Sequence, residues 1–178
     1  KDIAAPIAMA HHGGATDQLF AAGKSEQVHD YLKAVHDHGM LAGVSAHNPD
    51  CIQRVADAGW EADFFMTCFY FITRKSPPAG AGPGGPQVLE VSYTFYKDDP
   101  AVMTRVVRQV KQPCLGFKIL AAGRMCKNQD TVRGAFRFAF ENIKPTDAVI
   151  VGMYPRFFDE MSANARYACE FGGGPQRA

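Results

Sequence analysis

Three histidines stand where apolar runs of the sequence end, and their imidazoles could transfer protons near neutral pH. His11 and His12 follow the apolar run at positions 6–10, and His47 follows the run at positions 40–45. If the two runs are neighbouring parallel strands, their ends meet at one edge of the sheet, and we expect the histidines to share a site. An imidazole there could act as a general acid or base. The alternative is structural, with His12 capping the Gly-Gly turn and His47 bonding to loop backbone.

Lys118 lies inside the apolar run at positions 114–120, where an ammonium group must be paired or lose its charge. Three roles are open for it. It could form a Schiff base as a nucleophile, hold an anionic group of a substrate or cofactor, or pair with a buried acid. The candidate catalytic residues are His11, His12, His47 and Lys118.

The histidines could instead hold a divalent metal ion, because such ions bind imidazole and carboxylate groups. Asp17 would supply the carboxylate. No closely spaced ligand motif stands at the ends of the apolar runs. The H-x-H spacing of His36 and His38 falls on a helix that we expect, together with His29, at the surface. The metal ligands therefore stay unknown at this stage.

Glycine-containing turns follow the last two apolar runs and could hold the phosphate groups of a cofactor. Gly123 and Arg124 come after the run at positions 114–120, and Gly152 lies in the run at positions 147–153. Barrel enzymes often bind phosphate at such turns through backbone N–H groups and a helix N-terminus. The candidate cofactor-binding residues are Lys118, Gly123, Arg124 and Gly152.

Composition favours a small-molecule partner. The 178 residues carry a net charge of +1 without a basic stripe, so we expect no binding to nucleic acid. No run approaches the roughly 18 apolar residues of a membrane span, and no signal peptide is visible, so we expect no membrane partner. The five cysteines are scattered without a C-x-x-C pair, which indicates a reducing compartment such as the cytoplasm. Cys68 could be a nucleophile, although a small buried residue is the simpler interpretation.

The candidate residues belong to a repeating alternation of apolar runs and amphipathic helices. We expect strands at positions 6–10, 40–45, 63–71, 114–120 and 147–153, and helices that begin near positions 26, 49, 99, 130 and 158. Ser25 and Asn48 are the expected N-caps of the first two helices. The run at positions 63–71 shows no polar alternation, which indicates a strand covered on both faces.

Five strands that are each followed by a helix predict a parallel sheet, because parallel neighbours need long crossovers. A doubly wound sheet would carry G-x-G-x-x-G after its first strand, and HHGG does not match it. We therefore predict an α/β fold of the (β/α)₈ TIM-barrel type with about five β-α units present. A complete barrel takes about 250 residues, and the chain starts at Lys1 and not at Met, so we expect N-terminal units to be missing.

Residues 1–178 are expected to form a single domain, the C-terminal portion of that barrel. The proline- and glycine-rich tract at positions 76–86 cannot bury apolar surface, and we expect a flexible loop there. An opened barrel has two unpaired strand edges, so we expect this chain alone to form homo-oligomers or to aggregate.

Several stretches resemble the aldo/keto reductases, with similarity over roughly positions 40–168. They are LAGVSAHNPDCIQRVADAG, FKILAAGR, and VIVGM followed by Glu160 and Asn164. The resemblance implies a TIM barrel, NADP as cofactor, and a catalytic histidine for which His11 or His12 would stand. The family's aspartate, tyrosine and lysine lie on strands that this chain lacks. HHGG, GVSAHNP, MTCFY and FKILAAGR are also similar to uncharacterised bacterial barrel proteins.

The leading expectation is an aldo/keto reductase-like oxidoreductase that acts on a small polar carbonyl or hydroxyl compound. His11 or His12 would donate the proton, and Lys118 and Arg124 would bind anionic groups. Two alternatives stay open. One is a metal-dependent isomerase, lyase or hydrolase with His11, His12 and His47 near the ion, and the other is a non-catalytic barrel that binds small molecules.

Overall fold

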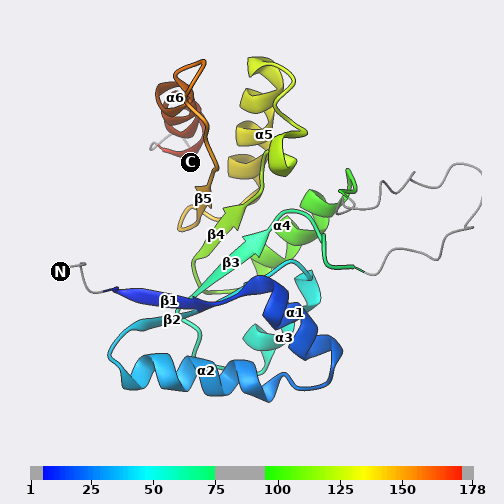
Figure 1. Cartoon of the computed structure of the whole chain (residues 1–178), viewed down its shortest axis with the longest axis vertical. Helices are drawn as coiled ribbons and strands as arrows, with labels where there is room; N and C mark the ends of the chain where they lie inside the picture. The colour runs from blue at the N-terminus through cyan, green and yellow to red at the C-terminus, as the bar shows by residue number, and fades with distance from the viewer. Residues whose placement is uncertain (1–5, 75–94, 174–178) are drawn as a thin grey trace, which may run out of the picture.

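The computed structural model describes residues 6–74 and 95–173. Within them, one all-parallel sheet contains its strands in the order of the sequence (Figure 1). The strands are β1 (Ala8–His11), β2 (Leu41–Ala46), β3 (Phe64–Cys68), β4 (Cys114–Phe117) and β5 (Ala148–Ile150). The helices between and after them are α1 (Gly13–Ala21), α2 (Glu26–Asp37), α3 (Pro49–Asp57), α4 (Asp99–Gln109), α5 (Gln129–Asn142) and α6 (Glu160–Gly172). The predicted α/β fold with a parallel sheet is therefore confirmed.

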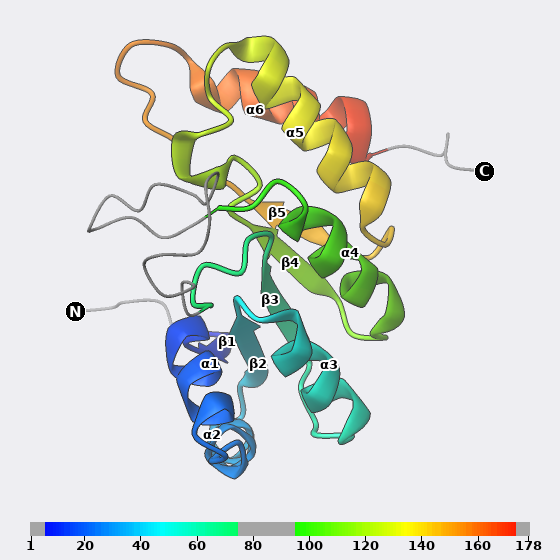
Figure 2. The ribbon, with the colours of Figure 1, turned by 90° about the vertical axis from the view of Figure 1, so that its right-hand side faces the viewer.

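The helices line one side of the sheet. Right-handed crossovers between strands that follow one another in sequence order place every connecting helix on the same face. On that face Ala42, Val44 and Phe65 are completely buried, and Figures 1 and 2 show the helices arranged around the outside of the twisted sheet. On the opposite face Leu41 is 51% exposed and Ile150 42%.

The strand at β3 is consequently covered less evenly than its sequence predicts. Phe65 faces the helices and is buried, whereas Phe64 and Met66 point to the other face and are only half-buried. The expectation that both faces are covered is wrong for the part of the chain that the structure describes. That expectation depended on the unbroken apolar pattern of positions 63–71. The same pattern arises when the helices cover only one face of a strand and the other apolar face stays partly exposed.

Apolar stripes on the helices form the core against the sheet. Val28 and Leu32 of α2, and Ile52 and Val55 of α3, are buried at spacings of three or four residues. The side chain of Asn48 accepts a hydrogen bond from the N–H of Asp50 at 3.1 Å, so its predicted capping role is confirmed. Ser25 occupies the N-cap position of α2, as predicted, but its side chain makes no capping hydrogen bond.

Two departures from the predicted elements affect the candidate site. The Gly-Gly pair after His12 opens helix α1, where a loop was expected. Strand β4 ends at Phe117, because Lys118 has a left-handed backbone with φ of +59° that cannot continue a strand. Lys118 therefore lies just beyond the strand and not inside it.

Other boundaries differ less. β3 ends at Cys68 and β5 at Ile150, three residues earlier than predicted in each case. The expected loop at positions 76–86 lies outside the described residues. No described helix is long and apolar enough to cross a membrane.

Candidate functional site

A hydrogen-bonded histidine–aspartate pair lies at the carboxyl ends of the first two strands. His47 directly follows β2, and Asp17 lies on α1, which follows β1. Nδ1 of His47 is 2.9 Å from Oδ2 of Asp17, and the two side chains are 11% and 6% exposed. Because an ionised carboxylate can only accept, Nδ1 carries the ring proton. Nε2 is then the basic nitrogen of the neutral ring, and it has no hydrogen-bond partner among the described residues.

Asp17 accepts hydrogen bonds from three further groups. The N–H groups of His47 and Asn48 donate to its carboxylate at 3.2 Å each, and the hydroxyl of Thr73 donates at 2.7 Å. Burial by itself would raise the pKa of Asp17, but the bonds from His47, Thr73 and Asn48 outweigh it and lower the pKa. The carboxylate is therefore charged at ordinary pH and holds the imidazole in one orientation.

The close approach of α1 to β2 depends on Gly13. A Cβ at this position would lie 3.0 Å from Oγ of Ser45 and 3.1 Å from Cε1 of His47. Any side chain there would have to displace the imidazole or the first turn of α1. The glycine thus permits the helix to bring Asp17 to the histidine.

A partly open hollow of about 810 Å³ adjoins the pair. Its lining comes from α1 and from the segments that follow β1, β2, β3 and β4. These residues are His12, Gly14, Ala15, Asp17, Gln18, Ala21, His47, Ile72, Thr73 and Lys118, and we call the cavity the histidine hollow. Three of the predicted catalytic residues, His12, His47 and Lys118, therefore line one cavity. His12 is exposed at it and makes no capping bond to α1.

Lys118 brings a positive charge to the histidine hollow. Its Nζ lies 5.9 Å from the centre of the Phe117 ring, and the ammonium has no hydrogen bond or ion pair with any described residue. A left-handed backbone at a residue with a side chain is strained, and such strain is concentrated at functional positions. No described carboxylate pairs with Lys118, so its role as an anion clamp has more support than a structural ion pair.

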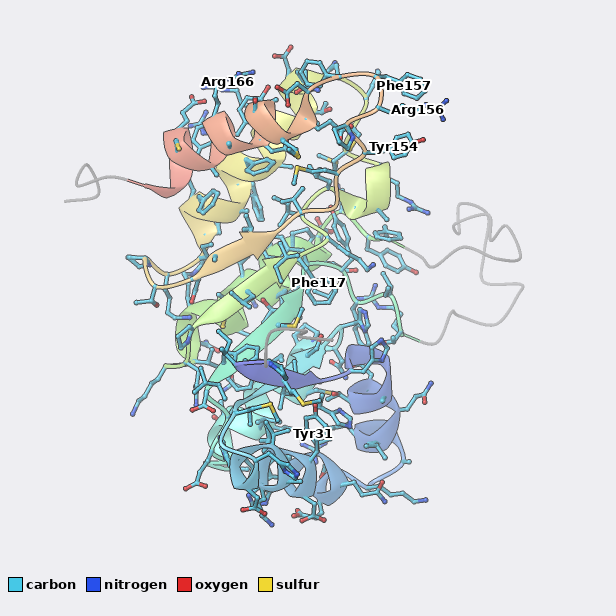
Figure 3. All side chains as sticks on the ribbon, turned by 60° about the vertical axis from the view of Figure 1, so that its left-hand side comes forward. Tyr31, Phe117, Tyr154, Arg156, Phe157 and Arg166 are labelled. Atoms are coloured by element: carbon cyan, nitrogen blue, oxygen red, sulfur yellow. The ribbon has the colours of Figure 1, made fainter. Side chains whose placement is uncertain are left out.

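The structure does not bring His11 to the hollow. Its Nδ1 is 2.7 Å from Oγ1 of Thr16, and its ring meets the edge of Tyr31 on α2 at 5.0 Å between centres. Figure 3 shows Tyr31 on α2, on the helix side of β1. Burial, and then the adjacent His12, lower the pKa of His11. His11 thus packs between β1 and the helices as a neutral side chain, and His12 is the member of the pair that faces the hollow.

A second hollow of about 560 Å³ contains most of the predicted cofactor-binding residues. Lys118, Gly123 and Gly152 all line it, together with Tyr154 and Glu160, and we call it the glycine hollow. The two hollows share Lys118. Arg124 is not among the lining residues, because its guanidinium stacks on the ring of Phe95 at 4.0 Å and donates to the carbonyl of Ala121.

The glycine hollow offers few cationic groups to the phosphates of a dinucleotide. Phosphate sites need free backbone N–H groups or cations. The N–H of Gly123 already donates to Leu120 and that of Arg124 to Ala121, at 3.0 and 3.3 Å. The Glu160 carboxylate faces the same hollow and accepts from the N–H of Tyr154. Lys118 is the one cation among the described lining residues, so a single positive charge would face two phosphates.

Neither a cysteine nucleophile nor a metal centre emerges from the described residues. Burial raises the pKa of Cys68 to about 12, and burial followed by the Asp17 charge does the same for Cys51. Both thiols therefore stay protonated, and the core interpretation of Cys68 has more support. Within residues 6–74 and 95–173, no group of three or more His, Cys, Asp or Glu side chains could hold a metal ion.

A second histidine–aspartate pair lies at the amino ends of the strands. Nε2 of His36 is 2.8 Å from Oδ2 of Asp63, which also accepts from the N–H of Ala42 at 2.7 Å. These side chains are 31% and 36% exposed and line neither named hollow. Ligands of parallel sheets bind at the carboxyl ends of the strands, so this pair lies at the opposite end from the candidate site.

Sequence reasoning did not identify Thr73, nor the pairing of Asp17 with His47. Thr73 lies in the irregular segment after β3, where a single threonine carries no signal. Asp17 was considered only as a metal ligand. An aspartate three residues after a Gly-Gly pair would have indicated this pairing if the glycines had been interpreted as the start of a helix.

Comparison of the chain with models of protein families, with curated proteins and with solved structures found no match. We therefore infer the function of the protein from the geometry of the site.

Proposed function

We propose that this protein is an enzyme that acts on a small polar carbonyl or hydroxyl compound bearing an anionic group, bound in the histidine hollow. The proposal depends on one observation. Buried Asp17 orients the His47 ring, and Nε2 of that ring has no hydrogen-bond partner among the described residues. His47 lies in a cavity that Lys118 also lines. A neutral imidazole held in this way is a general base at Nε2.

The proposed chemistry is proton transfer at that nitrogen. Nε2 removes a proton from a carbon next to a carbonyl, and the electron pair of the broken C–H bond moves onto the carbonyl oxygen to give an enolate. The Asp17 carboxylate stabilises the imidazolium that forms. Returning the proton to the product restores the neutral ring. Lys118 binds the anionic group and places the reacting atom near Nε2.

We propose further that the sheet is part of a TIM-type barrel. Sequential order of parallel strands, helices on one side and a half-exposed apolar opposite face are the features that support it. In a closed barrel that apolar face would be the interior. Self-association of the chain alone remains a prediction of this architecture.

The anion-binding role of Lys118 predicts a charge-dependent ligand effect. In a thermal-shift screen of small oxo- and hydroxycarboxylates, at least one acid should raise the melting temperature of the wild type. Lys118→Met should need about tenfold more ligand for the same rise in melting temperature. This is the change expected for losing about 1.4 kcal/mol of charge-assisted binding. Lys127→Met, at an exposed position outside both hollows, is the matched control. An equal response of wild type and Lys118→Met would contradict the role.

The resemblance to aldo/keto reductases adds a separate prediction, that the protein binds NADPH. The positions of Gly123, Gly152 and Lys118 around one hollow favour it, whereas the occupied N–H groups and Glu160 oppose it. Fluorescence titration with NADPH decides between them. A saturable change in NADPH fluorescence would support a reductase. No change at millimolar NADPH would exclude the reductase and leave the acid–base function, which does not need this cofactor.

A further inference from the structure

Three donors contact one oxygen of Asp17. Oδ2 accepts from Oγ1 of Thr73 at 2.7 Å and from Nδ1 of His47 at 2.9 Å, whereas the N–H of His47 is shared between both oxygens at 3.2 and 3.3 Å. A carboxylate oxygen has two lone pairs in the plane of the group, and the two short side-chain bonds match that number. Oδ1 accepts from the N–H of Asn48 at 3.2 Å. The shortest of these bonds is the one from Thr73.

Thr73 is held in place independently of Asp17. Its neighbour Arg74 binds both oxygens of Asp99, with Nη1 at 3.1 Å and Nη2 at 2.6 Å. The same guanidinium lies over the rings of Phe71 and Tyr96, at 4.8 and 4.6 Å from their centres. Asp99 is buried and also accepts from the N–H of Phe71 at 3.1 Å. The start of α4 therefore fixes the segment on which Thr73 lies.

We propose that Thr73 is a positioning residue of the site, whose hydroxyl fixes the plane of the Asp17 carboxylate and thereby the orientation of the His47 ring. The terminal torsion of an aspartate is broad and roughly two-fold, so anchored donors select its setting. The backbone N–H groups of His47 and Asn48 do so at 3.2 Å or more, and the Thr73 hydroxyl adds the shortest bond, at 2.7 Å. The catalytic consequence rests on the proposed function, but the positioning itself is a property of the fold. It also connects the segment after β3 to a pair formed by α1 and β2.

The hydroxyl affects charge as well as geometry. Its hydrogen bond is one of the causes that lower the pKa of Asp17, after burial, which raises it, and the bond from His47. The other titratable groups around the carboxylate are His47 and the buried thiols of Cys51 and Cys68, and His12 and Lys118 line the same hollow. Loss of the hydroxyl should therefore raise the pKa of Asp17 and loosen the ring of His47.

The test compares Thr73→Val and Thr73→Ala, which lack the hydroxyl, with Thr73→Ser, which keeps it. Thr104→Val is the control, because Thr104 is also a threonine with a short bond, 2.8 Å to the carbonyl of Pro100, but lies on α4 outside both hollows. Carbon NMR of the Asp17 carboxyl group and nitrogen NMR of the His47 ring are followed against pH. Both readouts are independent of any substrate.

Thr73→Val and Thr73→Ala should each raise the pKa of Asp17 by about half to one pH unit and broaden the Nδ1–H signal of His47. Thr73→Ser should restore both signals, and Thr104→Val should leave both unchanged. Wild-type signals in the variants without the hydroxyl would overturn the proposal, and so would failure of Thr73→Ser to restore them. If these shifts occur but a variant of His47 keeps full activity, the positioning stands and the proposed function fails.

Discussion

Asp17→Asn should lower the free energy of unfolding by about 2–4 kcal/mol at neutral pH. Asp17 is buried and accepts hydrogen bonds from His47, Asn48 and Thr73. An asparagine can offer one carbonyl oxygen to these donors, and its amide nitrogen would face donors in place of an acceptor. At least one buried donor would therefore lose its partner. Denaturant unfolding of the two proteins measures the difference.

The effect should depend on pH in a defined direction. The folded pKa of Asp17 is lowered, so its contribution to stability is present above the unfolded pKa of about 3.9 and is lost as the pH falls through the folded pKa. The difference in the free energy of unfolding between wild type and Asp17→Asn should therefore be largest at neutral pH and should decrease below about pH 4. A difference in the free energy of unfolding that stays constant well below about pH 4 would show that the carboxylate charge does not matter.

Asp63→Asn supplies the matched control for that variant. Asp63 also accepts from an imidazole and from a backbone N–H, and hydrogen bonds also lower its pKa against the effect of burial. Its side chain is 36% exposed, against 6% for Asp17, so water can replace the lost partners. We expect a loss of under about 1 kcal/mol, as is usual for exposed ion pairs. Equal losses at the two positions would contradict the special status of Asp17.

The fold class followed from patterns that depend only on local chemistry. Apolar runs such as that at positions 40–45, and helix stripes such as Val28, Leu32 and Val35, mark strands and helices because burial repeats with the period of each element. Those patterns alone do not order the strands, since each run could pair with any other. The parallel direction was predicted from the long crossovers, and the sequential order from the barrel hypothesis, and the sheet has both. The half-exposed opposite face was not predicted and became visible only in three dimensions.

The site was predictable in part for the same reason. His12, His47 and Lys118 stand at or next to strand ends, and the geometry of parallel sheets brings such ends together. His11 differs from His12 by one position, and neighbouring residues at a strand end point to opposite faces. Which of the two histidines faces the hollow therefore depends on the register of β1 in the sheet. The sequence alone does not predict that register.

The pairing of Asp17 with His47 could not be predicted, because it depends on a helix that begins at a glycine pair. Gly-Gly is typical of turns, and an expected loop gives no definite direction to the side chains that follow. The role of Thr73 could not be predicted, because its position depends on the Arg74–Asp99 pair, which joins segments 25 residues apart. Such contacts are properties of tertiary packing and leave no periodic pattern in the chain.

His47→Gln should lower the turnover of the substrate by about 10²–10⁴-fold while the protein stays folded. Glutamine can still place a polar group near Asp17, but it has no nitrogen that can take up a proton. His36→Gln is the control, because His36 also pairs with an aspartate but lies at the amino ends of the strands. We expect that control to keep wild-type activity within about twofold, because it touches neither hollow.

General-base catalysis by His47 can be tested directly by proton NMR. A panel of small oxo- and hydroxycarboxylates is incubated in heavy water with wild type, His47→Gln and His36→Gln. General-base chemistry at Nε2 predicts that the wild type and His36→Gln convert at least one acid, or exchange its proton next to the carbonyl for deuterium, and that His47→Gln does neither. Conversion at the wild-type rate by folded His47→Gln, or an unchanged panel with the wild type, would contradict the account.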